Sequence, residues 1–187
     1  DGPSANVACG ALQQGDCCIS FGTTTVTRFL TDRLIEDIKQ EYFCQHFYNG
    51  WYFQGIRLND TGRDVETYMR LSDGKREDAQ GCFFMGNAFF PRDPGRPGMR
   101  FQAVMDSVLF RVYSTMESAV EQAGIQRLYC TGGGSRDIEW MQKFSDLFQM
   151  EIVLQNHTDL FGGVAAFALV CTGEAPNLWA ASKRIKR

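Results

Sequence analysis

The chain has 187 residues, of which 44% are hydrophobic and 22% are charged, and this composition fits one soluble domain with a sizeable core. A formal net charge of −3 gives no electrostatic case for nucleic acid or for an anionic membrane, so neither is expected as a partner. No signal peptide is visible. The longest apolar run, residues 160–171, is too short to cross a bilayer and is expected to form a buried helix.

The seven cysteines form no C-x-x-C pair, and the two histidines show no zinc-ligand spacing. We therefore expect buried, reduced thiols, a cytoplasmic protein and no metal site built by these residues. The chain begins with Asp1 rather than Met, so we expect a processed product or a fragment, and it could also be half of a two-domain protein. The basic residues 183–187 are expected to form a solvated tail.

The first part of the chain predicts a helix followed by a β-hairpin. Residues 1–12 contain an acid, an early proline and then small residues, which is typical of a helix start, with Asp1 read as an N-cap. Residues 17–21 and 25–29 are predicted strands. The turn between them carries hydroxyls that usually satisfy the turn itself but also suit a phosphate; it consists of Gly22, Thr23 and Thr24.

The middle of the chain is less regular. Residues 32–48 are interpreted as a short helix or excursion, and residues 51–58 as a third strand. A loop at residues 59–62 leads into a helix that continues through Met69. A strand is expected at residues 82–84 and an irregular loop at residues 89–98. Residues 99–122 place apolar side chains at three-four spacing, which predicts a long amphipathic helix with core methionines.

A glycine-rich stretch, TGGGSRD at residues 131–137, separates a predicted strand at residues 125–130 from a helical pattern that starts near Trp140. Glycine lets a backbone approach a ligand, and the following helix N-terminus offers unpaired N–H groups to an anion. Glycines can also simply make a tight connection. A second polar turn at residues 22–24 favours a cleft that holds a nucleotide. Residues 151–154 (strand) and 160–172 (helix) complete an α/β domain with a mixed sheet.

These segments, in this order, resemble the C-terminal domain of the FGGY-family carbohydrate kinases over nearly the whole chain. Residues 131–135 with Trp140 look like the adenine-side motif of that family. Gly22-Thr23-Thr24 resembles the hairpin that cradles the ATP phosphates, and the turn at residues 59–62 is similar to a further nucleotide-contacting turn. The resemblance implies a ribonuclease-H-like fold of the actin and sugar-kinase type, with a mixed sheet flanked by helices and residues 1–187 forming one domain.

The resemblance also implies a function: ATP-dependent phosphorylation of a sugar or polyol hydroxyl, with this chain supplying the nucleotide-binding half. Asp1 stands at the family's catalytic-base position, where a carboxylate accepts the hydroxyl proton. Mg²⁺ would bridge the phosphate oxygens, and the family's N-terminal domain, absent here, would be the partner. No Walker A sequence occurs. The residues expected at the nucleotide are Gly22, Thr23, Thr24, Gly62, Gly132, Gly133, Gly134 and Asp137.

Three alternatives stay open. Asn87-Ala88 stand where the family usually has Glu-Arg, and this departure favours a catalytically impaired pseudokinase or regulatory nucleotide-binding domain. An ATPase of the same fold would use water as its nucleophile. An α/β domain whose glycines only make turns would bind no nucleotide.

Overall fold

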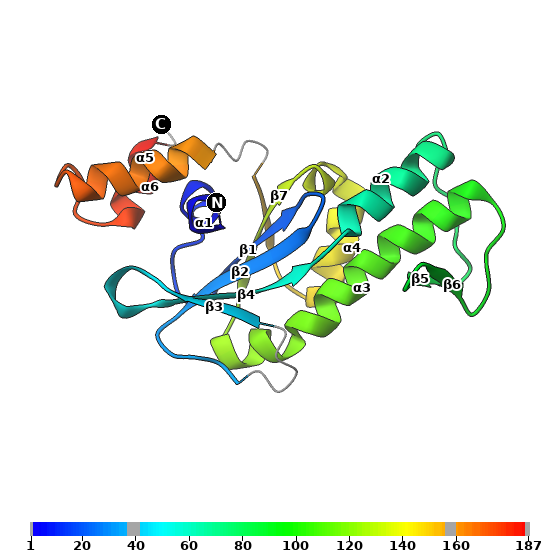
Figure 1. The fold of residues 1–187 in the computed structure, drawn as a ribbon, viewed down its shortest axis with the longest axis horizontal. Helices are drawn as coiled ribbons and strands as arrows, with labels where there is room; N and C mark the ends of the chain where they lie inside the picture. Colours follow the sequence, from blue (N-terminus) through cyan, green and yellow to red (C-terminus); the bar gives the residue numbers. More distant parts are fainter. Residues whose placement is uncertain (1, 37–41, 156–159, 186–187) are drawn as a thin grey trace.

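The computed structural model describes residues 2–36, 42–155 and 160–185, and Figure 1 shows their arrangement. A mixed six-stranded sheet with strand order β3-β4-β2-β1-β7-β8 lies at the centre. Its strands are β1 (Asp16–Phe21), β2 (Thr25–Thr31), β3 (Tyr42–His46), β4 (Tyr52–Leu58), β7 (Arg127–Gly132) and β8 (Ile152–Gln155). The predicted α/β class and mixed sheet are confirmed.

The strand register brings two of the predicted turns to the same end of the sheet. β1 and β2 form the predicted antiparallel hairpin, in which Phe21 pairs with Thr25 across the turn at residues 22–24. β1 also runs parallel to β7, and there Phe21 pairs with Gly132. The hairpin turn and the glycine-rich stretch therefore lie next to each other at the ends of adjacent strands, although more than 100 residues separate them in the sequence.

Helices cover both faces of the sheet. α1 (Gly2–Cys9), α5 (Leu160–Cys171) and α6 (Leu178–Ile185) pack together on one side. α3 (Pro97–Ala123) and α4 (Ile138–Phe148) cover the other side, and α2 (Thr61–Leu71) packs along α3 (Figure 1). Side chains alternate across a strand, so Cys17, Ile19 and Phe21 of β1 join the core under α3 and α4, whereas Cys18 contacts α1 through Cys9.

A small hairpin packs beside α3, at the end of the molecule far from α5 and α6 (Figure 1). It consists of β5 (Phe83–Met85) and β6 (Ala88–Phe90), with Met85 paired to Ala88. The two turn residues, Gly86 and Asn87, both have positive φ, as a two-residue type I′ turn requires. The loop predicted for residues 89–98 thus begins inside a strand, because β6 pairs with β5.

Three predictions about elements need correction. Residues 42–46 form the edge strand β3 instead of a helix, because they pair with β4 and Tyr42 packs against Phe29 with ring centroids 6.3 Å apart. Residues 178–185, unassigned or expected as a tail, form α6, which is fixed by a 2.8 Å hydrogen bond from the Ser182 hydroxyl to the Val7 carbonyl.

The helix predicted to be buried, α5, is buried on one side only. It packs so closely on α1 that a Cβ on Gly163 would lie 2.1 Å from the Ser4 carbonyl oxygen. The opposite side exposes an apolar stripe, Val164, Ala165 and Ala168, with Cys171 at its end. None of the helices in the described part of the chain combines the length and apolarity needed to cross a bilayer.

Candidate functional site

A cleft of about 390 Å³ lies where three segments meet: the β1–β2 turn, the start of α2, and residues 132–137, which we call the glycine turn. Six of the predicted nucleotide residues line it: Gly22, Thr23, Gly62, Gly133, Gly134 and Asp137. Thr24 and Gly132 belong to the same turns but do not line the cleft. Asp1, the predicted catalytic base, lies outside the described residues.

The start of α2 lies directly against the β1–β2 turn. The Gly62 N–H donates a 3.0 Å hydrogen bond to the Thr23 carbonyl, and a Cβ on Gly62 would lie 1.9 Å from the Gly22 carbonyl oxygen. Only glycine allows this approach. Beside it, the buried Thr61 hydroxyl accepts a 3.0 Å hydrogen bond from the Thr25 N–H and lies 2.8 Å from the Thr25 hydroxyl. These contacts join the two segments into one wall of the cleft.

The glycine turn contains three glycines with different surroundings. Gly132 has φ +93°, and a Cβ there would lie 2.4 Å from the Phe21 carbonyl oxygen. A Cβ on Gly134 would lie 2.8 Å from the Phe21 Cβ and 3.1 Å from the Trp140 ring. Gly133 has ordinary helical angles, φ −60° and ψ −43°, and a Cβ there would meet nothing within 4 Å. The fold therefore requires Gly132 and Gly134 but leaves open space at Gly133, which faces the cleft.

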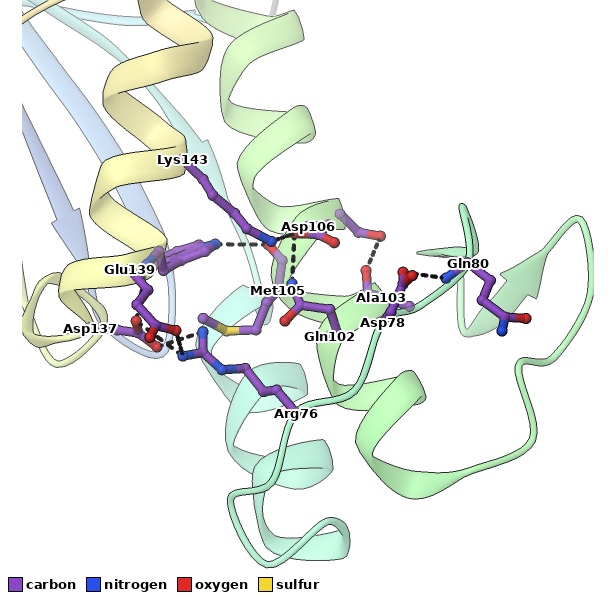
Figure 2. A network of polar contacts seen from close by, with 12 residues as sticks. Arg76, Asp78, Gln80, Gln102, Ala103, Met105, Asp106, Asp137, Glu139 and Lys143 are labelled. Atoms are coloured by element: carbon purple, nitrogen blue, oxygen red, sulfur yellow. Dashed lines mark hydrogen bonds and ion pairs between the residues drawn. The ribbon is translucent and has the colours of Figure 1, made fainter.

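Asp137 ends the glycine turn and begins α4. Its Oδ1 accepts a 3.0 Å hydrogen bond from the Trp140 N–H, so it is the N-cap of the helix. The guanidinium of Arg76 forms an ion pair with the same carboxylate at 2.9 Å and with Glu139 at 3.0 Å (Figure 2). The Asp137 carboxylate is thus already bound by two protein partners.

The far wall of the cleft is apolar. It is formed by side chains of α3 and by Trp140 of α4; the α3 residues are Phe101, Met105 and Val108. Trp140 is 2% exposed, its indole Nε1–H donates a 3.1 Å hydrogen bond to the Met105 carbonyl, and its ring lies 4.9 Å from that of Phe21. The helical spacing predicted these side chains as core, and it gave no signal that one edge of that core would remain open.

Three further polar residues line the cleft, Thr25, Thr61 and Glu66. Thr25 and Thr61 adjoin or belong to the predicted turns, whereas nothing in the sequence signalled Glu66 on α2. The arrangement offers hydroxyls and backbone N–H groups at one end and apolar and aromatic side chains at the other. In the described residues no cluster of three or more His, Cys, Asp or Glu could hold a metal ion. Such a cleft suits a ligand with a polar or anionic part and a flat apolar part.

Five of the seven cysteines are buried, as predicted, whereas Cys44 and Cys171 are exposed. A hydrogen bond from Cys9 and the nearby Arg28 guanidinium lower the pKa of Cys18 to about 7, whereas burial raises the pKa of Cys17. Arg28 itself is buried at 6% exposure, and its Nε–H donates a 3.2 Å hydrogen bond to Asn6. The cluster of Cys9, Cys18 and Arg28 lies on the α1 face of the sheet and does not line the cleft.

No protein-family profile matches the sequence. The gluconokinase of Bacillus licheniformis is 23% identical over 93% of the chain and 42% of its own length. The gluconokinase of Bacillus subtilis is 22% identical over 99% of the chain and 44% of its own length. The chain therefore spans less than half the length of the curated relatives it matches.

Solved structures show the same relationship. The ligand-bound xylulose kinase and the gluconate kinase from Lactobacillus acidophilus superpose with TM-scores of 0.83 and 0.82, each at 16% identity over 98% of this chain and 44% of theirs. Glycerol kinase from Plasmodium falciparum with ADP gives 0.80 at 15% identity, again over 98% and 44%. The structural neighbours are FGGY-type kinases, and the chain has their actin-like, ribonuclease-H-like fold. The resemblance seen in the sequence is confirmed.

Proposed function

We propose that this chain is the nucleotide-binding half of a kinase that transfers the γ-phosphoryl group of ATP to a hydroxyl of a sugar or polyol. One observation carries the proposal: three segments, predicted separately as nucleotide-contacting turns, line one cleft. The kinase relatives support it, and one of the similar structures is described with ADP. An open position at Gly133 supports it further, because the fold gives no reason for glycine there.

In this proposal the polar end of the cleft receives the phosphates. The hydroxyl and N–H groups of Thr23 stabilise charge on the transferring group, and Gly22 and Gly62 keep side chains away from it. The flat base packs against the apolar wall that the α3 side chains and Trp140 form. The backbone at Gly133 lies against the nucleoside. Mg²⁺ bound with the nucleotide would neutralise phosphate charge.

The proton of the attacking hydroxyl goes to Asp1 in this proposal. A sugar hydroxyl is a poor nucleophile, and a carboxylate at hydrogen-bond distance accepts its proton as the new O–P bond forms. This role comes from the family resemblance alone.

The remaining part of the enzyme would be an N-terminal half that supplies most of the sugar contacts, and catalysis would need both halves. The exposed apolar stripe of α5 (Val164, Ala165 and Ala168) supports such a partner, because a contiguous apolar surface is typical of an interface. The residues 1–187 would then act as one domain of a cytoplasmic enzyme.

The test is phosphoryl transfer by the intact protein with MgATP and a panel that includes gluconate, xylulose and glycerol. We expect transfer to at least one member, and Asp1→Asn should lower turnover by about 10²- to 10⁴-fold while ATP affinity is retained. Unchanged turnover in the variant would remove Asp1 from the mechanism.

Nucleotide binding without transfer to any sugar would favour the regulatory alternative, and hydrolysis without a sugar would favour the ATPase. The departure that motivated the regulatory alternative, Asn87-Ala88, lies at the tip of the β5–β6 hairpin. Asn87 has φ +69° there, a conformation that asparagine tolerates well, so the turn gives it a structural reason.

A further inference from the structure

Arg76 lies outside the cleft lining and connects the segment before β5 to Asp137, the last residue of the glycine turn. It lies in the segment between α2 and β5 (residues 72–82), and its guanidinium contacts the carboxylate of Asp137 through two nitrogens, at 2.9 and 3.4 Å. The Arg76 and Asp137 side chains are 24% and 29% exposed, so this pair is half-buried, whereas its other partner, Glu139, is 86% exposed. Figure 2 shows the three side chains converging.

On one side, Arg76 acts on the glycine turn through Asp137. The turn is held by short-range bonds: the Asp137 N–H donates to the Gly134 carbonyl at 3.3 Å, and the Ser135 hydroxyl donates to the Gly132 carbonyl at 2.8 Å. The Asp137 carboxylate continues this chain of bonds into α4 through the Trp140 N–H. Fixing that carboxylate therefore fixes the last residue of the turn that borders the cleft.

On the other side, the segment that carries Arg76 is attached to the start of α3. The Glu77 N–H donates a 3.2 Å hydrogen bond to the Gly98 carbonyl, and Glu77 forms a 2.8 Å ion pair with Arg96. α3 supplies the apolar wall of the cleft. Arg76 thus joins the α2–α3 side of the cleft to the glycine turn and α4.

We propose that Arg76 is a positioning residue for the nucleotide: it holds Asp137, and through it the glycine turn, in the binding geometry before the ligand arrives. This inference rests on the proposed function. A two-nitrogen contact to a carboxylate fixes geometry as well as charge, and a preformed site avoids the ordering cost of binding.

The test is calorimetric titration of the intact protein with ADP, comparing the wild type with Arg76→Ala. We expect ADP to bind about five- to tenfold more weakly to the variant. This loss is smaller than the full free energy of one charge-assisted hydrogen bond, because Arg76 acts on the nucleotide only through Asp137. Lys143→Met is the matched control, because it removes another α4–α3 ion pair, Lys143 to Asp106 at 3.2 Å, that does not touch the glycine turn. The control should bind ADP within about twofold of the wild type.

A mutant cycle separates positioning from general weakening of the fold. Asp137→Asn keeps the oxygen that caps α4 but loses the charge, so in that background Arg76→Ala should change ADP affinity by less than about twofold. A full additional loss there would overturn the inference, as would an Arg76→Ala variant that binds like the wild type. If Arg76→Ala fails to fold, Arg76→Lys replaces it, with a weakening of about threefold expected. No ADP binding by the wild type would overturn the proposed function and this inference together.

Discussion

At the scale of single residues, two of the three glycines in the glycine turn are required by the fold and the third is not. Gly132 needs its positive φ and its contact with the Phe21 backbone, and Gly134 packs against Phe21 and Trp140. Gly133 has neither constraint. Within the glycine turn, only Gly133 could be replaced by alanine without a clash or a strained φ. We therefore assign this glycine to the close approach of a ligand to the backbone.

Gly133→Ala and Gly132→Ala should therefore differ in thermal unfolding. We expect Gly133→Ala to leave the free energy of unfolding within about 0.5 kcal/mol of the wild type, because its φ suits any residue. Gly132→Ala should cost about 2–4 kcal/mol, since it combines a left-handed φ with a clash against backbone. Equal melting temperatures for the two variants would contradict this account of the turn.

The Thr25–Thr61 pair gives a second prediction at this scale. Thr61→Val leaves the buried Thr25 N–H without its acceptor, and we expect a loss of about 1–3 kcal/mol in urea unfolding. Thr61→Ser keeps the hydroxyl and serves as the control. A valine variant as stable as the serine variant would show that this hydrogen bond does not hold the wall together.

At the scale of elements, α1 is attached to the sheet by a polar contact. The Asn6 side chain accepts a hydrogen bond from Arg28 at 3.2 Å and donates to the Arg28 carbonyl at 3.3 Å, both in the interior. We expect Asn6→Leu to lower the free energy of unfolding by about 3 kcal/mol, because it leaves a buried guanidinium with fewer acceptors. Chemical denaturation measures this free energy, with Asn59→Leu at an exposed position as the control. A loss no larger than that of the control would contradict the prediction.

The elements also show what a sequence can predict. The β1–β2 hairpin and α3 follow from alternation, turn residues and three-four spacing, which are local signals. β3 could not be predicted because its side chains at residues 44–46 are exposed at an edge, and only pairing with β4 makes it a strand. The exposure of α5 was missed for a related reason: its uniform apolarity shows that it meets apolar surface but not on how many sides.

The candidate site was predictable in part. The turns that line the cleft carry glycine and hydroxyl signals, and the parallel pairing of β1 with β7 brings two of them together. The apolar wall and the Arg76–Asp137 pair could not be predicted, because they depend on how α3 and residues 72–82 pack in space. Nor does a sequence reveal that Gly133 differs from its neighbours.

At the scale of the whole molecule, the proposed two-domain enzyme predicts that the α5 stripe is covered by the partner domain. Cys171, at the end of the stripe, is exposed, as is Cys44 on β3. We expect a small alkylating reagent to label Cys171 readily in the isolated chain and at least about tenfold more slowly in the intact protein, since a buried thiol is protected from modification. Cys44 is the internal control. Equal labelling of Cys171 in both forms would place the partner elsewhere.

The most direct measurement of the central claim is a calorimetric titration of the intact protein with MgADP, repeated with Gly133→Val. The variant adds a branched side chain at the one glycine of the glycine turn that the fold does not require, at the edge of the cleft. We predict that the wild type binds MgADP and that the variant, with an unchanged circular dichroism spectrum, does not. Absence of binding by the wild type, or equal binding by both, would contradict the assignment of this cleft to a nucleotide.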